Sequence, residues 1–280
     1  MRKSIVSGQF YEADAEQLRA QVMGFLEKAR VLKTKIHGAI APHAGYVFSG
    51  QCAAYSYNML KEQGPETYIL LGVNHSGHGM SSFAVSLDDF ETPLGIVEND
   101  KQFSKELIKL KNVEHNETSH KFEHSLEVQL PFLQCIKKKY ELKIVPIVIM
   151  YHNIELCKRV AQDIVNVAKK LKRKVKIIAS SDFTHYGSNY GFLPFSPQEA
   201  KTKLKEFDGK AIEHIEKLDT KNFLEFASKA TICGSGAIAT CIEICKLLGS
   251  KKARLLKYYT SGEILGDYNN AVGYASISFE

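Results

Sequence analysis

The sequence predicts a single α/β domain with a mixed or mostly parallel central sheet and helices on both faces. Two observations predict it. Short apolar segments rich in β-formers alternate with longer segments of helical periodicity, and no linker rich in Pro, Gly or Ser interrupts them. The 280 residues are 44% hydrophobic and 24% charged, a globular composition that excludes disordered and collagen-like chains. We therefore expect residues 1–280 to form one domain.

Seven segments are expected to form strands, because each is apolar or alternating and too short for a buried helix. Pro146 lacks the N–H that an interior strand uses, so its strand is expected at an edge, or Pro146 at a strand end. The strands are 36–41, 67–73, 82–87, 143–150, 175–180, 253–259 and 271–279. Helical periodicity predicts helices at 49–61 (stopping at Gly64-Pro65), 100–109, 126–138, 154–171, 197–218, 222–228 and 236–248.

The formal net charge is +6, and the basic residues are densest at 137–139 and 169–174. Each of these stretches follows an amphipathic segment, which is typical of the solvated last turn of a helix. No aromatic residues interleave with the charges, so a nucleic-acid surface is disfavoured.

Several features favour a cytoplasmic protein. No apolar run approaches the ~18 residues of a membrane span, and residues 1–8 have no apolar stretch like that of a secretory signal. The six cysteines include no CxxC pair, which indicates reduced thiols.

Histidines follow three of the predicted strands: His43 after 36–41, His75 after 67–73 and His185 after 175–180. Parallel strands place their carboxyl ends on one edge of a sheet, so these imidazoles can meet around one cation. Imidazole is a ligand for Fe, Cu and Zn. The pattern therefore predicts a metal site, with Asp182 as a ligand or as a group that orients one. A further stretch, Glu123-His124-Ser125, opens the predicted helix 126–138.

Cys233 precedes the helix 236–248 within the sequence Cys-Gly-Ser-Gly. A helix start lowers a thiol pKa, so Cys233 is a candidate ligand or nucleophile. Two alternatives stay open: a small buried apolar residue, and the nucleophile of a cysteine hydrolase with His185 as its base. Cys241 and Cys245 share one helix face and are expected in the core.

Six stretches in order along the chain resemble the Memo family, known in archaea and bacteria as component B of the AMMECR1–Memo–radical-SAM system. The resemblance covers essentially the whole chain. The stretches are SGQFY at 7–11, APHAGY at 41–46, GVNH at 72–75, EHSLEVQLPF at 123–132, SSDFTHYG at 180–187 and CGSG at 233–236.

The resemblance implies the fold of the class III extradiol dioxygenases, which hold a non-haem Fe(II) with two His and one Glu. It implies that His43 and His75 are metal ligands and that Cys233 takes the place of the Glu. His185, with Asp182 beside it, falls at the acid/base position of the dioxygenases. Fe(II) is the expected ion, and Cu or Zn is also compatible because a thiolate is a softer ligand than a carboxylate. AMMECR1-like and radical-SAM proteins are the partners that the resemblance implies.

Two functions follow from these observations. The first is a mononuclear non-haem iron protein with redox or dioxygenase-type chemistry on an unidentified small molecule or peptide. The second is a non-catalytic binding module whose histidines and glycine-flanked helix start recognise an anionic group or a phosphopeptide. Metal binding by His43, His75 and Cys233 separates the two.

Overall fold

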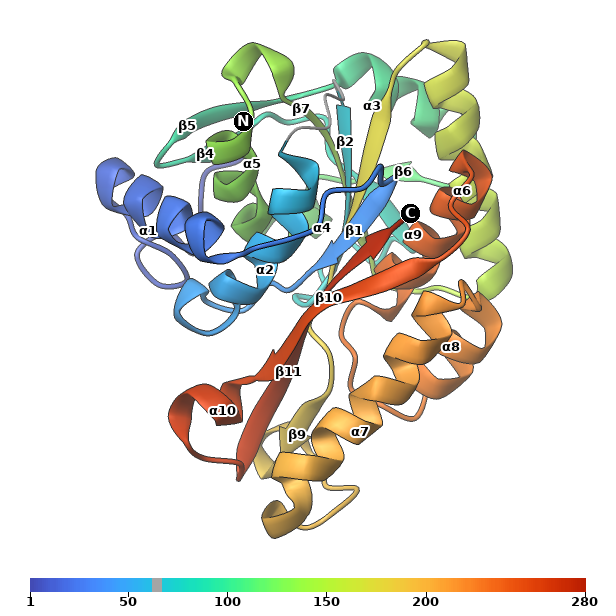
Figure 1. Ribbon diagram of the computed structural model, residues 1–280. Helices are drawn as coiled ribbons and strands as arrows, with labels where there is room; N and C mark the ends of the chain where they lie inside the picture. The colour runs from blue at the N-terminus through green and yellow to red at the C-terminus, as the bar shows by residue number, and fades with distance from the viewer. Residues whose placement is uncertain (62–66) are drawn as a thin grey trace.

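A central sheet covered by helices on both faces confirms the predicted α/β class (Figure 1). The computed structural model describes residues 1–61 and 67–280, so the predicted helix stop at Gly64-Pro65 lies outside the described residues. The strand order is β10-β11-β1-β8-β2-β7-β3-β6. The middle strands run parallel to one another: β1 (Gly38–Ala41), β8 (Val175–Ser180), β2 (Thr67–Val73) and β7 (Lys143–Ile149).

Antiparallel strands complete the sheet at both edges and make it mixed. On one side β1 pairs with β11 (Asn270–Phe279), which pairs with β10 (Ala253–Thr260) and with β9 (His185–Gly187). On the other side β7 pairs antiparallel with β3 (Phe83–Val85), and β3 pairs with β6 (Glu114–His115). A hairpin of β4 (Phe90–Thr92) and β5 (Gly95–Asn99) joins β7 through β5. The short strands β4, β5, β6 and β9 were not expected from the sequence.

Pro146 lies in an interior strand, so the expectation that it marks an edge or a strand end is wrong. β7 pairs with β2 along its whole length. On its other side, β5 pairs with the first two residues of β7 and β3 with the last three, so Pro146 falls between two partners. The Ser86 N–H donates to the Pro146 carbonyl (3.2 Å). Pro146 has no N–H to donate in return to the Ser86 carbonyl. The side-chain amide of Asn99 donates to that carbonyl instead (2.7 Å).

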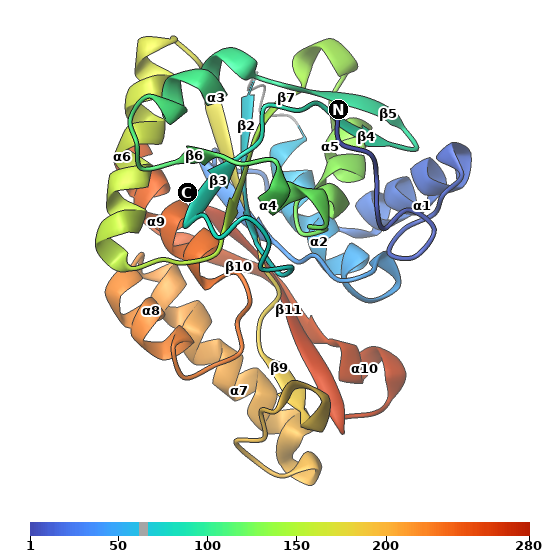
Figure 2. The same ribbon diagram turned by 180° about the vertical axis from the view of Figure 1, so that it is seen from behind.

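Helices pack on both faces and each face has its own apolar core (Figures 1 and 2). Buried side chains at helical spacing explain the packing, as in the first helix, where Leu18, Val22 and Leu26 are buried one turn apart. One face carries α1 (Ala15–Lys28), α2 (Tyr46–Leu60) and α5 (Leu130–Ile136). The other face carries α3 (Lys101–Ile108), α6 (Ile154–Lys170), α8 (Thr220–Ala227) and α9 (Ser235–Leu248).

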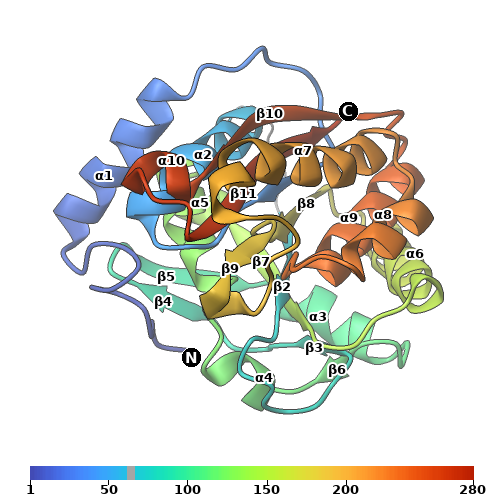
Figure 3. The ribbon, with the colours of Figure 1, turned by 90° about the horizontal axis from the view of Figure 1, so that it is seen from below.

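Several further elements lie around one end of the sheet. Figure 3 shows β9 and the end of β11 gathered there with α7 (Pro197–Glu216) and α10 (Ser261–Leu265). The short helix α4 (Thr118–Lys121) and the 3-10 helix η1 (Glu127–Gln129) precede α5. In the two described ranges, residues 1–61 and 67–280, every helix is too short or too polar to cross a membrane.

Candidate metal centre

The carboxyl ends of three neighbouring parallel strands carry the histidines that the sequence singled out. β8 lies between β1 and β2, so the segments bearing His43, His185 and His75 leave the sheet at adjacent positions. Because the three strands are parallel, these three segments lie on one edge of the sheet.

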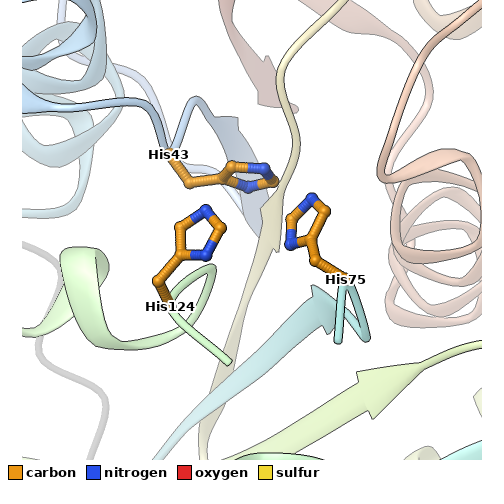
Figure 4. A group of neighbouring side chains, drawn as sticks. All are labelled: His43, His75 and His124. Carbon is orange, nitrogen blue, oxygen red and sulfur yellow. The ribbon is translucent and has the colours of Figure 1, made fainter. Parts of the chain in front are cut away.

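Three imidazoles point toward one another at this edge: His43, His75 and His124 (Figure 4). Each offers one ligand atom, and these atoms all lie within 4.8 Å of one another. The ring centroids of His43 and His75 are 5.1 Å apart, and those of His75 and His124 are 4.7 Å apart. Three imidazole nitrogens at this spacing match the first requirement of a transition-metal site.

His124 comes from a loop, not from a strand end, and it is not among the ligands expected from the sequence. The loop joins α4 to η1, and Ser125 fixes it to the end of β2. The Ser125 hydroxyl accepts a hydrogen bond from the Val73 N–H (3.0 Å) and donates to the Val73 carbonyl (3.1 Å). The motif Glu123-His124-Ser125 was the only sign of His124 in the sequence, because contacts between distant segments place this loop.

Hydrogen bonds hold His43 in one tautomer. The Ser180 hydroxyl donates to the Ser125 carbonyl (2.6 Å) and accepts from the Gln129 amide (2.8 Å). Its remaining contact, 3.0 Å to His43 Nδ1, must therefore have His43 Nδ1–H as the donor. This leaves Nε2 of His43 as a lone-pair donor. Burial lowers the pKa of His43 well below its usual range, and the neighbouring histidines add to this, so the ring stays neutral.

A buried carboxylate orients His75. Glu123 is 2% exposed and accepts from the His75 backbone N–H (2.6 Å) and from His75 Nδ1 (3.0 Å). It also accepts from the Ser125 N–H (2.7 Å) and lies 3.7 Å from His124 Nδ1. Burial alone raises the pKa of Glu123, but these partners hold it at about 2. A carboxylate that fixes the Nδ1 side of an imidazole leaves Nε2 free for a metal.

Opposing effects set the charge of His75. Burial alone lowers its pKa, but hydrogen bonds to Cys233 and Glu123 outweigh burial and raise the pKa to about 10. A metal ion that binds Nε2 of His75 must displace any proton there, because a histidine ligand is unprotonated at the ligating nitrogen.

The Cys233 thiol lies beside the same histidines. Its Sγ is 3.2 Å from His43 Nε2, and the Asp182 N–H donates to it (3.3 Å). Gly234, the N-cap of α9, brings the chain this close: a Cβ there would lie 2.4 Å from Ser181 Cβ. The expectation that a helix start lowers the pKa of Cys233 is wrong, because burial raises it.

Asp182 and His185 differ from each other in their surroundings. The Asp182 carboxylate is buried and accepts from the His43 backbone N–H (2.8 Å), so it positions a histidine. Burial raises the pKa of Asp182, although the nearby His185 works in the opposite direction. His185 Nδ1 lies 3.0 Å from the Thr231 carbonyl, so it donates there and leaves Nε2 as the acceptor. In the described part of the chain, no hydrogen bond joins His185 to the other three histidines.

The other cysteines lie apart from this edge. Cys241 and Cys245 are buried in the core of the α9 face, as expected, with their sulfur atoms 3.9 Å apart. All six cysteines are free thiols.

Acidification is expected to destabilise the protein through His120, which lies in α4. His120 is 1% exposed, and its Nε2 lies 2.9 Å from the Ala84 carbonyl. Burial lowers its pKa from 6.5 to about 4. Between those values the unfolded chain takes up a proton that the folded protein does not, so stability falls as pH falls and is fully retained above 6.5. At about 1.4 kcal/mol per pKa unit, the loss is about 3 kcal/mol at pH 4.

Denaturant unfolding between pH 4.5 and pH 7 checks this in the wild type and in His120→Gln, whose amide can still donate to the carbonyl. The variant should lose about 2–3 kcal/mol less on acidification. Equal losses in both proteins would contradict the prediction.

The chain is similar to known proteins over nearly its whole length. Residues 2–278 match the family model described as "Memo-like protein". A MEMO1 family protein of Methanopyrus kandleri is 38% identical over 291 residues, covering 99% of this chain and 98% of that protein. A MEMO1 family protein of Methanosarcina barkeri is 39% identical over 282 residues, covering 100% of both chains. One of Nitrosopumilus maritimus is 37% identical over 288 residues, covering 100% of this chain and 99% of that protein.

Proposed function

The chain belongs to the Memo family, whose fold is extradiol dioxygenase-like, and from that premise we propose that it binds one metal ion for redox chemistry. The proposed ligands are His43, His75 and Cys233, with His124 beside them. The observation that carries the proposal is the set of three imidazoles whose ligand atoms lie within 4.8 Å of one another.

The donor set suits a transition metal. Hydrogen bonds at Nδ1 leave Nε2 of His43 and of His75 available, and Cys233 adds a sulfur 3.2 Å from His43 Nε2. Imidazole with thiolate selects Fe, Cu or Zn over Mg or Ca. We take Fe(II) as the ion, as in the dioxygenases of similar fold. A redox-active ion held there supplies electron-transfer or oxygenation chemistry to a bound small molecule or peptide.

The chain's own groups have separate tasks in this proposal. Ser180 and Glu123 keep the two imidazoles in the tautomer that exposes Nε2. Asp182 holds the backbone of His43 in place. His185, with Nδ1 donated to the Thr231 carbonyl, offers Nε2 as a base that accepts a proton from the substrate.

The alternative of an anion-binding module in the same pocket has less support. The Glu123 carboxylate contacts His75, and the buried Asp182 carboxylate lies against His43. Both would repel an anionic group, whereas both favour a cation.

Metal analysis tests the proposal. The protein and its variants are loaded anaerobically with Fe(II), desalted and analysed for metal. We expect about one ion per wild-type chain and a loss of at least 10-fold in affinity in His43→Ala and His75→Ala. His115→Ala is the matched control, because that histidine is exposed and pairs with Glu117 outside the centre. Full retention of metal in both variants would contradict the proposal.

Two further variants decide the third ligand. Loss of Fe(II) in Cys233→Ser with retention in His124→Ala supports the thiolate set. The opposite result would replace Cys233 by His124 and leave a centre of three histidines.

Location and partners rest on separate arguments. We propose a cytoplasmic location, because six free thiols persist in a reducing compartment. AMMECR1-like and radical-SAM proteins are proposed partners on the family resemblance alone.

A further inference from the structure

A fourth parallel strand also carries a histidine beyond its carboxyl end. His152 follows β7, the strand next to β2. Its Nε2 lies 3.2 Å from the hydroxyl of Ser235, the first residue of α9. Ser235 is two residues beyond Cys233 in the same Cys-Gly-Ser-Gly segment. The first residue of this segment therefore belongs to the candidate metal centre, and the third forms a pair with His152.

The pair opens into a cavity. A pocket of about 510 Å³ is lined by both residues, and the pocket also includes Ile154, Leu224 and Ala227 as apolar wall. This volume lies in the range of small-molecule sites, which are mostly apolar with a few polar groups. The metal ligands His43, His75 and Cys233 do not line it.

The contact depends on a glycine. A Cβ at Gly236 would lie 2.8 Å from two atoms of the His152 ring, so only glycine lets the imidazole lie against the start of α9. Burial lowers the pKa of His152. The ring is therefore neutral at neutral pH and can accept a proton, as a general base must.

We propose that Ser235 and His152 form a nucleophile–base pair that hydrolyses small esters with short aliphatic acyl chains. The serine is partly exposed, its hydroxyl is within hydrogen-bond distance of a base, and the apolar wall can hold the acyl chain. This activity needs no metal and does not rest on the redox function proposed above.

The reaction balances without a cofactor. Ser235 Oγ forms a bond to the acyl carbon while its proton passes to His152 Nε2. The first N–H groups of α9 have no partner within the helix, and in this proposal they stabilise the developing oxyanion. The acyl–oxygen bond of the ester then breaks, and the alcohol leaves with the proton from His152. Water, deprotonated by His152, then bonds to the acyl carbon. The bond between the acyl carbon and Ser235 Oγ breaks, His152 returns the proton to Oγ, and the carboxylic acid leaves.

Covalent labelling of the chelator-treated, full-length protein tests the pair. A fluorophosphonate probe should add once, and peptide mass spectrometry should place the adduct on Ser235. Labelling should vanish in Ser235→Ala and slow by about 100-fold or more in His152→Ala. Ser228→Ala is the matched control, because Ser228 lines the same pocket. It should label at the wild-type rate. Because the protein is chelator-treated, this test is separate from that of the metal centre.

Turnover of p-nitrophenyl acetate and p-nitrophenyl butyrate gives a second measurement. The wild type and Ser228→Ala should hydrolyse both esters. Ser235→Ala and His152→Ala should hydrolyse neither. If His152→Ala is less folded by circular dichroism, His152→Asn keeps a polar, uncharged side chain and should show the same loss. An unlabelled Ser235 in the folded wild type, or equal rates with and without His152, would overturn the proposal.

Discussion

Replacing Glu127 with alanine is expected to lower the free energy of unfolding by about 3–5 kcal/mol. Glu127 is fully buried, and its carboxylate lies 2.7 Å from the Arg2 guanidinium, which is itself buried. Removing the carboxylate leaves a buried positive charge without its partner, and desolvation makes such a charge costly.

Further donors increase this cost. The Glu127 carboxylate also accepts from the Tyr11 hydroxyl (2.6 Å) and from the backbone N–H groups of Ile5 (2.9 Å) and Val6 (3.0 Å). The side chain therefore ties residues 2–11 to the segment that follows His124. In turn, Arg2 donates to the His120 carbonyl (2.8 Å), so the same network supports the loop of the candidate metal centre.

Urea denaturation at pH 7 measures the effect. Glu91→Ala is the control, because Glu91 forms an ion pair with the exposed Lys3, the residue that follows Arg2 in the sequence. A surface pair of this kind contributes less than about 1 kcal/mol. Losses of similar size in the two variants would show that the buried network does not carry the stability assigned to it.

Replacing Glu123 with glutamine is expected to weaken metal binding by about 10–100-fold. The carboxylate accepts from His75 Nδ1 and holds the imidazole so that Nε2 is available. A glutamine can present its NH₂ group to Nδ1 and so favour the wrong tautomer. It also removes the negative charge that lies next to the proposed cation.

Competition with a chromophoric chelator measures this affinity in the wild type and the variant. Glu117→Gln is the matched control, since Glu117 lies 3.0 Å from Nε2 of the exposed His115 and forms the same kind of pair outside the centre. It should bind metal as tightly as the wild type. Unchanged affinity in Glu123→Gln would mean that His75 is not a ligand or needs no carboxylate to orient it.

The sequence predicts best what neighbouring residues determine. The apolar runs of β2 and β8 have the bounds expected from the sequence, because burial on both faces selects continuous β-forming residues. Parallel pairing then brings the segments bearing His43, His75 and His185 to one edge of the sheet.

Long-range contacts explain what the sequence did not predict. The loop with His124 is placed by Ser125 against β2, and Pro146 is accommodated by an amide from Asn99. The strands β4, β6 and β9 have two or three residues each and form only because a partner is present. The helix α1 was also not expected, although Asp14 caps it and its buried residues are one turn apart.

The glycines at 234 and 236 have a consequence for any attempt to alter either pocket. Each lies against a different neighbour, Ser181 in one case and the His152 ring in the other, and they flank a single residue. A side chain at either position must shift the shared backbone. Engineering one pocket by changing this segment would therefore disturb the other, and independent control of the two must come from the segments that follow β1 and β2 and from α8.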